Sequence, residues 1–362
     1  ANNALTDALR LAKLYNLAMP KTPPNHKQED YNYIVNQLIE SESLPNALTI
    51  FNTAFNQYWL NKISSRQDTG LNDINEEPLN IKALSQNEAL LKRLGHYMGG
   101  MIYYAGEWYW GVDRLDHFEE RANALGLSKQ ANEPIFFNRT YANFCQNTGL
   151  GIHPSQTEPL TLFFSIRSTY SHLGLERAIA LTKHYNIKLI IKPVLPMVMR
   201  GLAVPSSKKM YIFHDTKREA KKYGINYGYV ADPLGQGVER CYALYEYAQR
   251  KDKSVEFLLA YARAVNALGI RSETDSGLRT ILSTCGLSWD EAKPFLTNDT
   301  WRKWADRNLK EMYALGLWGV PSFKYQQTTV WGQDRLFAIE DAIIQANNSK
   351  AQNIKPEPVK VS

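Results

Sequence analysis

Residues 160–194 read LTLFFSIRSTYSHLGLERAIALTKHYNIKLIIKPV and carry two apolar runs on either side of a helical pattern. The run from Leu160 to Ile166 has the length and composition of a short buried strand. Apolar residues recur at helical spacing over residues 171–185, and residues 187–194 form a second strand-like run. The segment therefore predicts a β-α-β unit.

The chain beyond this segment predicts a helical insertion followed by a hairpin and a last helix. Apolar residues keep helical spacing through much of residues 197–316. Residues 321–331 contain two strand-like stretches around a two-residue turn, and residues 334–347 read as a helix. The predicted order is β-α-β, helices, β-β-α.

Two motifs within this order resemble one known family. Residues 163–173 (FFSIRSTYSHL) resemble the family pattern Tyr-Phe-Asp-x-x-Ser-Pro-Tyr-Ser-Tyr-Leu, and residues 318–323 (WGVPSF) resemble its cis-proline turn. Residues 159–345 are thus similar to the DsbA-like thioredoxin-fold family, in particular to 2-hydroxychromene-2-carboxylate isomerases and kappa-class glutathione transferases. The resemblance implies an α/β thioredoxin fold with a large helical insertion.

The chain also contains an internal repeat. Residues 110–115 (WGVDRL) are matched by residues 331–336 (WGQDRL) at an offset of 221. Nearer the amino terminus, five residues within 7–15 match residues within 215–223 at an offset of 208. Since self-similarity at a fixed offset is the signature of repeated architecture, two related units in tandem are predicted.

The repeat divides the chain into four expected segments. Residues 1–126 would form a degenerate, incomplete DsbA-like unit of helices with a carboxyl-terminal hairpin and helix. Residues 127–158 would be a connector, residues 159–347 the complete DsbA-like domain, and residues 348–362 a disordered tail.

The first unit lacks the β-α-β part of the second. At the offset of 208, the counterparts of residues 160–208 would precede Ala1, so this stretch has no match in the chain. One interpretation is that the chain begins inside a first domain whose amino-terminal piece is missing, cleaved or supplied separately. The other is that the first unit has degenerated and packs its hairpin on the second domain.

Ser168 is the candidate catalytic residue. It lies where a strand turns into a helix, and unpaired N–H groups and the helix dipole stabilise an anion at such a position. Disulfide enzymes of the family carry Cys-x-x-Cys there, and a serine cannot cycle as a disulfide, so such exchange is excluded for this domain. The resemblance implies that Ser168 donates a hydrogen bond to the thiolate of bound glutathione. The alternative is an ordinary helix N-cap.

The resemblance implies further contacts to glutathione. A cis bond at Val320–Pro321 would hold the cysteinyl backbone, Gln333 and Asp334 the γ-glutamyl group, and Lys209 the glycyl carboxylate. The alternatives are an ordinary turn proline for Pro321, an acid that balances the helix dipole for Asp334 and a solvated surface lysine for Lys209. Supporting candidates around Ser168 are Arg167, Thr169, Tyr170 and Ser171. Two positions depart from the family pattern, since Leu202 and Ser165 replace its Asn and Asp.

Composition restricts the choice of partners. The chain has 42 Lys and Arg against 36 Asp and Glu without a basic run, which argues against a nucleic-acid partner. The three cysteines form no CxxC or Cys/His cluster that would bind a metal, and the longest apolar run, residues 189–199, is interrupted by Lys192 and two prolines. No secretory signal is visible. We expect a cytoplasmic protein without a membrane or metal partner.

The leading hypothesis is a glutathione-dependent isomerase or transferase that acts on a conjugated, aromatic-derived small molecule. The alternative is a non-catalytic thioredoxin-fold module that binds a thiol or a peptide. Because family members pair as homodimers, the two units are also expected to form a pseudo-dimer within one polypeptide.

Overall fold

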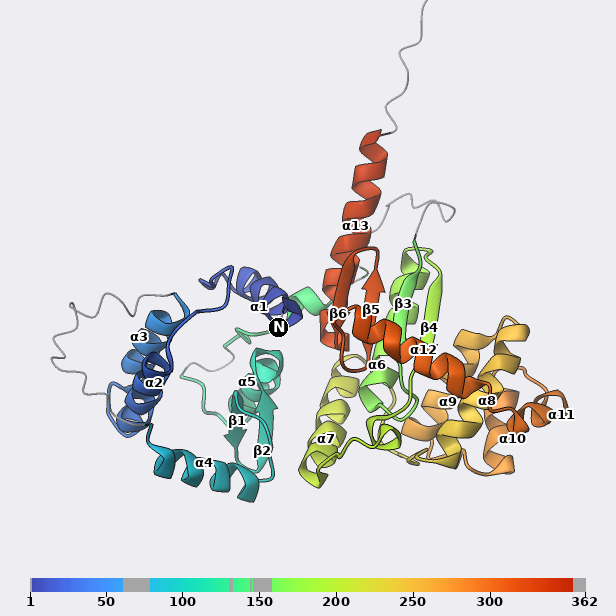
Figure 1. Cartoon of the computed structure of the whole chain (residues 1–362), viewed down its shortest axis with the longest axis horizontal. Helices are drawn as coiled ribbons and strands as arrows, with labels where there is room; N and C mark the ends of the chain where they lie inside the picture. The colour runs from blue at the N-terminus through green and yellow to red at the C-terminus, as the bar shows by residue number, and fades with distance from the viewer. Residues whose placement is uncertain (1, 61–78, 130–132, 144, 146–157, 354–362) are drawn as a thin grey trace, which may run out of the picture. The chain divides into compact units, whose positions relative to one another are not determined.

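The computed structural model describes residues 2–60, 79–129, 133–143, 145 and 158–353. The chain divides into two compact units, Ala1–Tyr97 and Met98–Ser362, and each is described by itself (Figure 1). Half of the predicted connector and residues 354–362 of the predicted tail lie outside the described residues.

The first unit is helical and has a small core. Its helices are α1 (Asn2–Leu14), α2 (Gln28–Ser41), α3 (Ala47–Trp59) and α4 (Ile81–Arg93). Helices α2 and α3 pack together through the buried Ile34 and Ala54. Large apolar side chains remain at the surface, among them Leu48, which is 78% exposed, and Phe55, which is 50% exposed.

The second unit contains a four-stranded sheet in the order β4-β3-β5-β6. Its strands are β3 (Leu160–Phe164), β4 (Leu189–Pro193), β5 (Ser322–Tyr325) and β6 (Thr328–Trp331). Strands β3 and β4 are parallel and are joined by α6 (Thr169–His184), whereas β5 is antiparallel to both β3 and β6. The β-α-β unit and the hairpin predicted from the sequence are confirmed.

The predicted helical insertion separates β4 from β5. Its elements are η5 (Met197–Arg200), α7 (Ser206–Lys222), α8 (Gln236–Arg250), α9 (Ser254–Ala267), α10 (Asp275–Thr284), α11 (Trp289–Ala292), η6 (Lys293–Thr297) and α12 (Trp301–Ala314). After β6 follow η7 (Gln333–Arg335) and α13 (Leu336–Asn353). Helix α13 extends beyond the expected boundary at residue 347 because no Gly or Pro interrupts it before Asn353.

Helices cover the sheet on both faces, as successive residues of β3 show. Leu162 and Phe164 join the main core with Leu175 of α6, whereas Phe163 packs against Met312 of α12 on the other face. All five side chains are fully buried. A strand buried on both faces needs the continuous apolar run seen in the sequence.

A second, smaller hairpin precedes this sheet. It consists of β1 (Met101–Tyr104) and β2 (Glu107–Trp110), followed by η2 (Val112–Arg114) and α5 (Leu115–Ala124). The bounds of β1, β2 and η2 differ from those of β5, β6 and η7 by the same offset of 221, and the starts of α5 and α13 differ by it too. The sequence repeat is therefore also a structural repeat over these elements.

The small hairpin packs on the helical insertion. Arg218 of α7 donates a hydrogen bond of 2.7 Å to the carbonyl of Trp108, and the rings of Trp110 and Tyr211 lie 6.2 Å apart. Residues 98–126, which the sequence assigns to the first segment, thus belong to the compact unit that begins at Met98. Packing of this hairpin on the second domain is one of the two interpretations given above for the incomplete first repeat.

Candidate functional site

Ser168 lies just after the carboxyl end of β3 and caps α6. Its Oγ accepts a hydrogen bond of 3.2 Å from the N–H of Ser171. Ser171 is itself fully buried, and its Oγ accepts a hydrogen bond of 3.4 Å from the N–H of Ser165, which gives it a structural role. Within the described residues the hydroxyl proton of Ser168 has no acceptor.

The cis-proline lies against the same helix. The Val320–Pro321 bond is cis, as expected. A Cβ on Gly174 would lie 3.0 Å from Cγ of Pro321, so the proline ring packs directly on the backbone of α6. The backbone N–H and C=O of Val320 make no hydrogen bond to the part of the chain that is described. The fold thus packs Pro321, which follows the unpaired backbone of Val320, against α6, the helix that Ser168 caps.

Two neighbours of Ser168 bind the helical insertion rather than point to a ligand. Thr169 Oγ1 lies 2.8 Å from Thr216 Oγ1 of α7. Arg167 donates two hydrogen bonds, of 2.8 and 2.7 Å, to the carboxylate of Asp232. Both contacts hold the turn before α6 in place.

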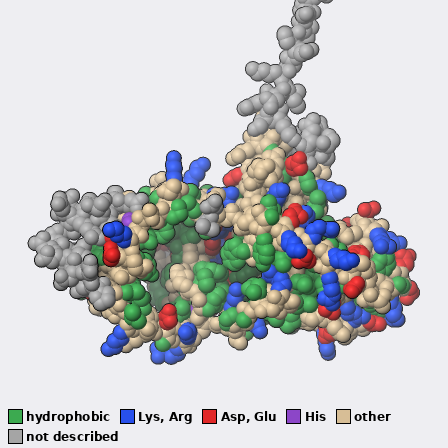
Figure 2. Space-filling model, viewed as in Figure 1, with side chains coloured by type: hydrophobic (Ala, Val, Ile, Leu, Met, Phe, Trp, Pro, Cys, Tyr) green, Lys and Arg blue, Asp and Glu red, His purple; other side chains and the backbone are tan. Residues whose placement is uncertain are grey.

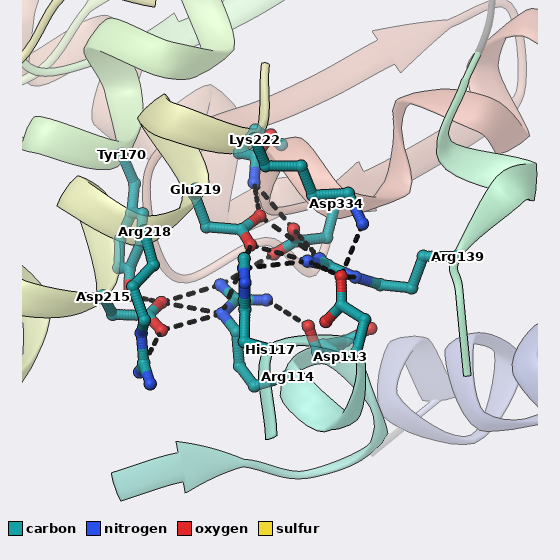
Figure 3. Close-up of polar contacts among 12 residues, drawn as sticks. Asp113, Arg114, His117, Arg139, Tyr170, Asp215, Arg218, Glu219, Lys222 and Asp334 are labelled. Atoms are coloured by element: carbon teal, nitrogen blue, oxygen red, sulfur yellow. Dashed lines mark hydrogen bonds and ion pairs between the residues drawn. The ribbon is translucent and has the colours of Figure 1, made fainter. Parts of the chain in front are cut away.

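Tyr170 leads from this turn into a buried cluster of charges that the sequence did not predict (Figure 3). Its hydroxyl donates a hydrogen bond of 2.5 Å to Asp215 Oδ2. Asp215 also accepts hydrogen bonds from Arg114 Nε, at 2.9 and 2.8 Å, and from Arg218 Nη2, at 2.9 Å. Burial and the Asp215 carboxylate raise the pKa of Tyr170 well above its ordinary value, so its hydroxyl stays a neutral donor.

The second half of the cluster centres on Arg139 of the connector. Arg139 Nη2 donates hydrogen bonds of 2.7 Å to both Glu219 Oε1 and Asp116 Oδ2. His117 Nε2 lies 2.8 Å from Glu219 Oε1, and Lys222 Nζ lies 2.5 Å from Asp116 Oδ2. These contacts join α5, the connector and α7 (Figure 3).

Both expected γ-glutamyl contacts lie in the cluster. The Asp334 oxygens are each 3.4 Å from an arginine, Oδ2 from Arg114 and Oδ1 from Arg139. Gln333 Nε2 donates to Asp334 Oδ1, at 2.6 Å, and to Glu219 Oε2, at 2.9 Å. The carboxylate of Asp334 is thus already paired with Arg114 and Arg139.

The cluster shifts the pKa values of its carboxyl groups in opposite directions. Burial alone would raise the pKa of Asp215, but the Arg114 guanidinium outweighs it and keeps this pKa below its ordinary value. The pKa of Glu219 is lowered further, again chiefly by Arg114 against the effect of burial. For Asp334 burial prevails, and the nearby Glu219 and Asp113 carboxylates help to raise its pKa to about 6.

The other expected contact to glutathione lies apart from these residues. Lys209 is exposed in the first turn of α7, and no described contact joins it to the turn that carries Ser168. Leu202, which stands where the family has Asn, is 45% exposed.

The sequence carried a partial signal for the buried cluster. The Asp113-Arg114 dipeptide recurs at Asp334-Arg335, and Asp215 is one of the residues matched at the offset of 208. The repeat does not show which side chains meet, so among these residues the sequence offers only Asp334 as a candidate, for a glutathione contact or for an acid that balances the helix dipole. Arg139 has no counterpart in the repeat and could not have been found in this way.

Other kinds of site find no support in the described part of the chain. It contains no group of His, Cys, Asp and Glu side chains placed to hold a metal ion, and its three cysteines are unpaired. No helix there is long and apolar enough to cross a membrane. On the face shown in Figure 2, basic and acidic side chains are intermixed over the second unit.

Solved structures with a similar fold include an isomerase, a disulfide reductase and a thiol-disulfide oxidoreductase. A 2-hydroxychromene-2-carboxylate isomerase is 20% identical, with a TM-score of 0.48, and the match covers 55% of this chain and 100% of that one. The cytosolic disulfide reductase DsbM from Pseudomonas aeruginosa, solved with GSH, is 15% identical, with a TM-score of 0.41 and coverage of 54% and 100%. A thiol-disulfide oxidoreductase, MdbA from Actinomyces oris, is 12% identical, with a TM-score of 0.36 and coverage of 56% and 86%.

Sequence comparison gives a narrower result. No curated protein sequence matches the chain. A model of the DSBA-like thioredoxin domain matches residues 159–344, which is just over half of the chain and coincides with the β-α-β, insertion and β-β-α elements described above. The chain therefore belongs to the DSBA-like thioredoxin domain family, as its sequence motifs predicted.

Proposed function

We propose that residues 159–347 form a glutathione-dependent isomerase or transferase that acts on a conjugated, aromatic-derived small molecule. The observation that carries this proposal is the position of Ser168, whose hydroxyl caps α6, the helix on which Pro321 packs at Gly174. A serine at this point can stabilise a sulfur anion but cannot form a disulfide with it.

The residues present fit the cysteinyl part of glutathione. Ser168 Oγ accepts from the N–H of Ser171, which leaves its proton to donate to a thiolate. The amino terminus of the 16-residue helix α6 favours negative charge at the same place. The unpaired N–H and C=O of Val320 can pair with the backbone of a peptide-like ligand, as an exposed strand edge does.

The fit is weaker for the γ-glutamyl part. Both Asp334 oxygens are engaged by arginines, and Gln333 is 1% exposed, so neither offers a free group to a ligand ammonium. The glycyl carboxylate would depend on Lys209, which is exposed. We therefore assign ligand binding chiefly to Ser168 and Val320–Pro321.

Bound glutathione would supply a thiolate able to add to a conjugated bond and to leave again. Ser168 would hold the sulfur in its ionised form by donating a hydrogen bond. The contacts Thr169–Thr216 and Arg167–Asp232 would keep the Ser168 turn fixed against the insertion. A reducing compartment, the cytoplasm, suits both this ligand and the three unpaired cysteines.

Two observations favour the alternative, a non-catalytic module that binds a thiol or a peptide. The engaged Asp334 and the exposed Leu202 remove two polar contacts that the family resemblance implies, whereas the Val320 backbone remains available. Such a module would bind an extended peptide along Val320 without needing the Ser168 hydroxyl.

Titration calorimetry with reduced glutathione, combined with ultraviolet absorbance of the bound thiolate, separates these functions. The wild-type protein should bind glutathione and lower the pKa of its thiol, whereas Ser168→Ala should bind it without lowering that pKa. Ser168→Thr, which keeps a hydroxyl and a cap, is the matched control. Turnover of hydroxychromene-type and electrophilic aromatic substrates by the wild-type protein alone would then support the enzyme. Absence of binding at millimolar glutathione would exclude this mechanism and favour the module.

A further inference from the structure

Strand β1 has only one partner among the described residues. In the larger sheet β5 lies between β3 and β6, whereas the smaller sheet consists of β1 and β2 alone. The two hairpins have equivalent registers, because Met101 pairs with Trp110 as Ser322 pairs with Trp331, at the offset of 221. The open edge of β1 is thus the edge that β5 uses to pair with β3.

The burial of matched residues also indicates that the smaller hairpin lacks the strand and helix that cover the larger one. Four residues of the larger hairpin and its helix are fully buried in the core that includes β3 and α6, namely Phe323, Leu336, Ile339 and Ile343. Their counterparts at the offset of 221 are also apolar but only partly buried, namely Ile102, Leu115, Phe118 and Ala122. Next to Ile102, Tyr103 is 40% exposed. The smaller hairpin keeps the apolar residues of a core that the described residues do not complete.

The smaller hairpin is nevertheless held firmly on its other side. Arg114 is paired with Asp215, His117 lies 2.8 Å from Glu219, and the carbonyl of Trp108 accepts from α7. A supported strand with one open edge is suited to accept another strand, because every unpaired N–H and C=O along it can be paired at once.

We infer that β1 is the acceptor edge for a β-α-β segment of the kind formed by residues 160–193, contributed by polypeptide outside residues 1–362. Its first strand lies antiparallel to β1 in the register of β3 on β5, with the equivalent of Leu162 opposite Ile102. The added helix covers Leu115 and Phe118. With this segment, the smaller hairpin and α5 become part of a second thioredoxin-type domain. That domain and residues 159–347 then form the pseudo-dimer expected from the repeat.

A copy of the chain's own segment serves as the probe. Residues 159–208 are joined ahead of Ala1 in the full chain, a junction set by the offset of 208 between the two units. Hydrogen exchange in residues 98–106 should slow at least tenfold, whereas exchange in the equivalent residues 319–327 should not change. The same variant carrying Ile102→Asp should lose the added protection.

Cross-linking tests the register. Phe163→Cys in the added copy should form a disulfide with Met101→Cys, since Phe163 pairs with Ser322 in the larger sheet. Tyr103→Cys, placed further along the same strand, should not react. A second arm adds residues 159–208 as a separate polypeptide, which distinguishes a segment joined to the chain from one that binds in trans.

Two results would overturn the inference. One is unchanged exchange in both arms together with no in-register disulfide. The other is protection of residues 98–106 in the unmodified chain that grows with protein concentration, because it would mean that a second copy of the chain occupies the edge.

Discussion

The guanidinium of Arg335 forms a two-pronged ion pair with the carboxylate of Asp113, with both nitrogen–oxygen distances at 2.8 Å. The reciprocal pair, Arg114 with Asp334, is longer, at 3.4 Å. The two Asp-Arg dipeptides occupy the same place in the repeat, so each copy contacts the other through the same two residues. The two ion pairs are therefore reciprocal.

We predict that Asp113 and Arg335 are energetically coupled. In a double-mutant cycle with Asp113→Ala and Arg335→Ala, the coupling should be about 1–3 kcal/mol, because both side chains are largely buried. Urea denaturation at pH 7 would measure it. Asp306 and Lys310, an exposed pair at 2.7 Å, are the matched control and should couple by less than about 0.5 kcal/mol. Equal coupling in the two cycles would contradict the prediction.

Asp215→Asn should destabilise the protein much more than Asp334→Asn. Asp215 is fully buried against Arg114, and breaking a buried charge pair costs about 3–5 kcal/mol. Asp334 has a raised pKa, which means that its surroundings disfavour the charge that Asn removes, so its substitution should cost at least about 2 kcal/mol less. Thermal or urea denaturation at pH 7 tests this order, and the reverse order would show that Asp334 is the stronger anchor.

The contributions of Asp334 and Asp215 to the free energy of unfolding should change with pH in opposite directions. The pKa of Asp334 is about 6 in the folded protein, above the ordinary 3.8, so the folded state binds more protons between these values. The contribution of Asp334 to the free energy of unfolding should therefore fall as pH rises from about 4 to 6, by roughly 1–3 kcal/mol. It is obtained as the difference between the wild type and Asp334→Asn at each pH.

For Asp215 the folded pKa is lowered, so its contribution is present above the ordinary value and is lost as pH falls below it. The corresponding difference between the wild type and Asp215→Asn should thus rise with pH. Slopes of the same sign for the two residues would contradict this assignment of their charge states.

Gly174→Ala should impair both stability and ligand binding. The added Cβ would lie 3.0 Å from Pro321 Cγ and 3.2 Å from Phe323 Cζ, which displaces the cis-proline turn. Overpacking of this kind costs about 1–3 kcal/mol and outweighs the gain of about 1 kcal/mol that Ala brings to a helix. Urea denaturation and glutathione calorimetry measure the two effects. Gly99→Ala, where a Cβ meets nothing within 4 Å, is the control and should behave like the wild type.

Much of the fold could be predicted from the sequence because its signals are local. The apolar run beginning at Leu160 predicted β3, and the helical spacing of residues 171–185 predicted α6. The cis bond at Pro321 was also expected, although only through the family resemblance. The extension of α13 to Asn353 was missed because a polar composition suggests disorder even where no helix breaker is present.

The elements of residues 160–347, their order and the repeated hairpin can be predicted from local patterns, because strand and helix periodicity and repeated motifs lie in neighbouring residues. Which charges meet depends on the fold. Arg114 and Asp215 are 101 residues apart, and Arg335 and Asp113 are 222 apart. A carboxylate such as Asp334 looks available to a ligand until the fold brings Arg114 and Arg139 beside it, because charge pairing depends on distance in space and not along the chain.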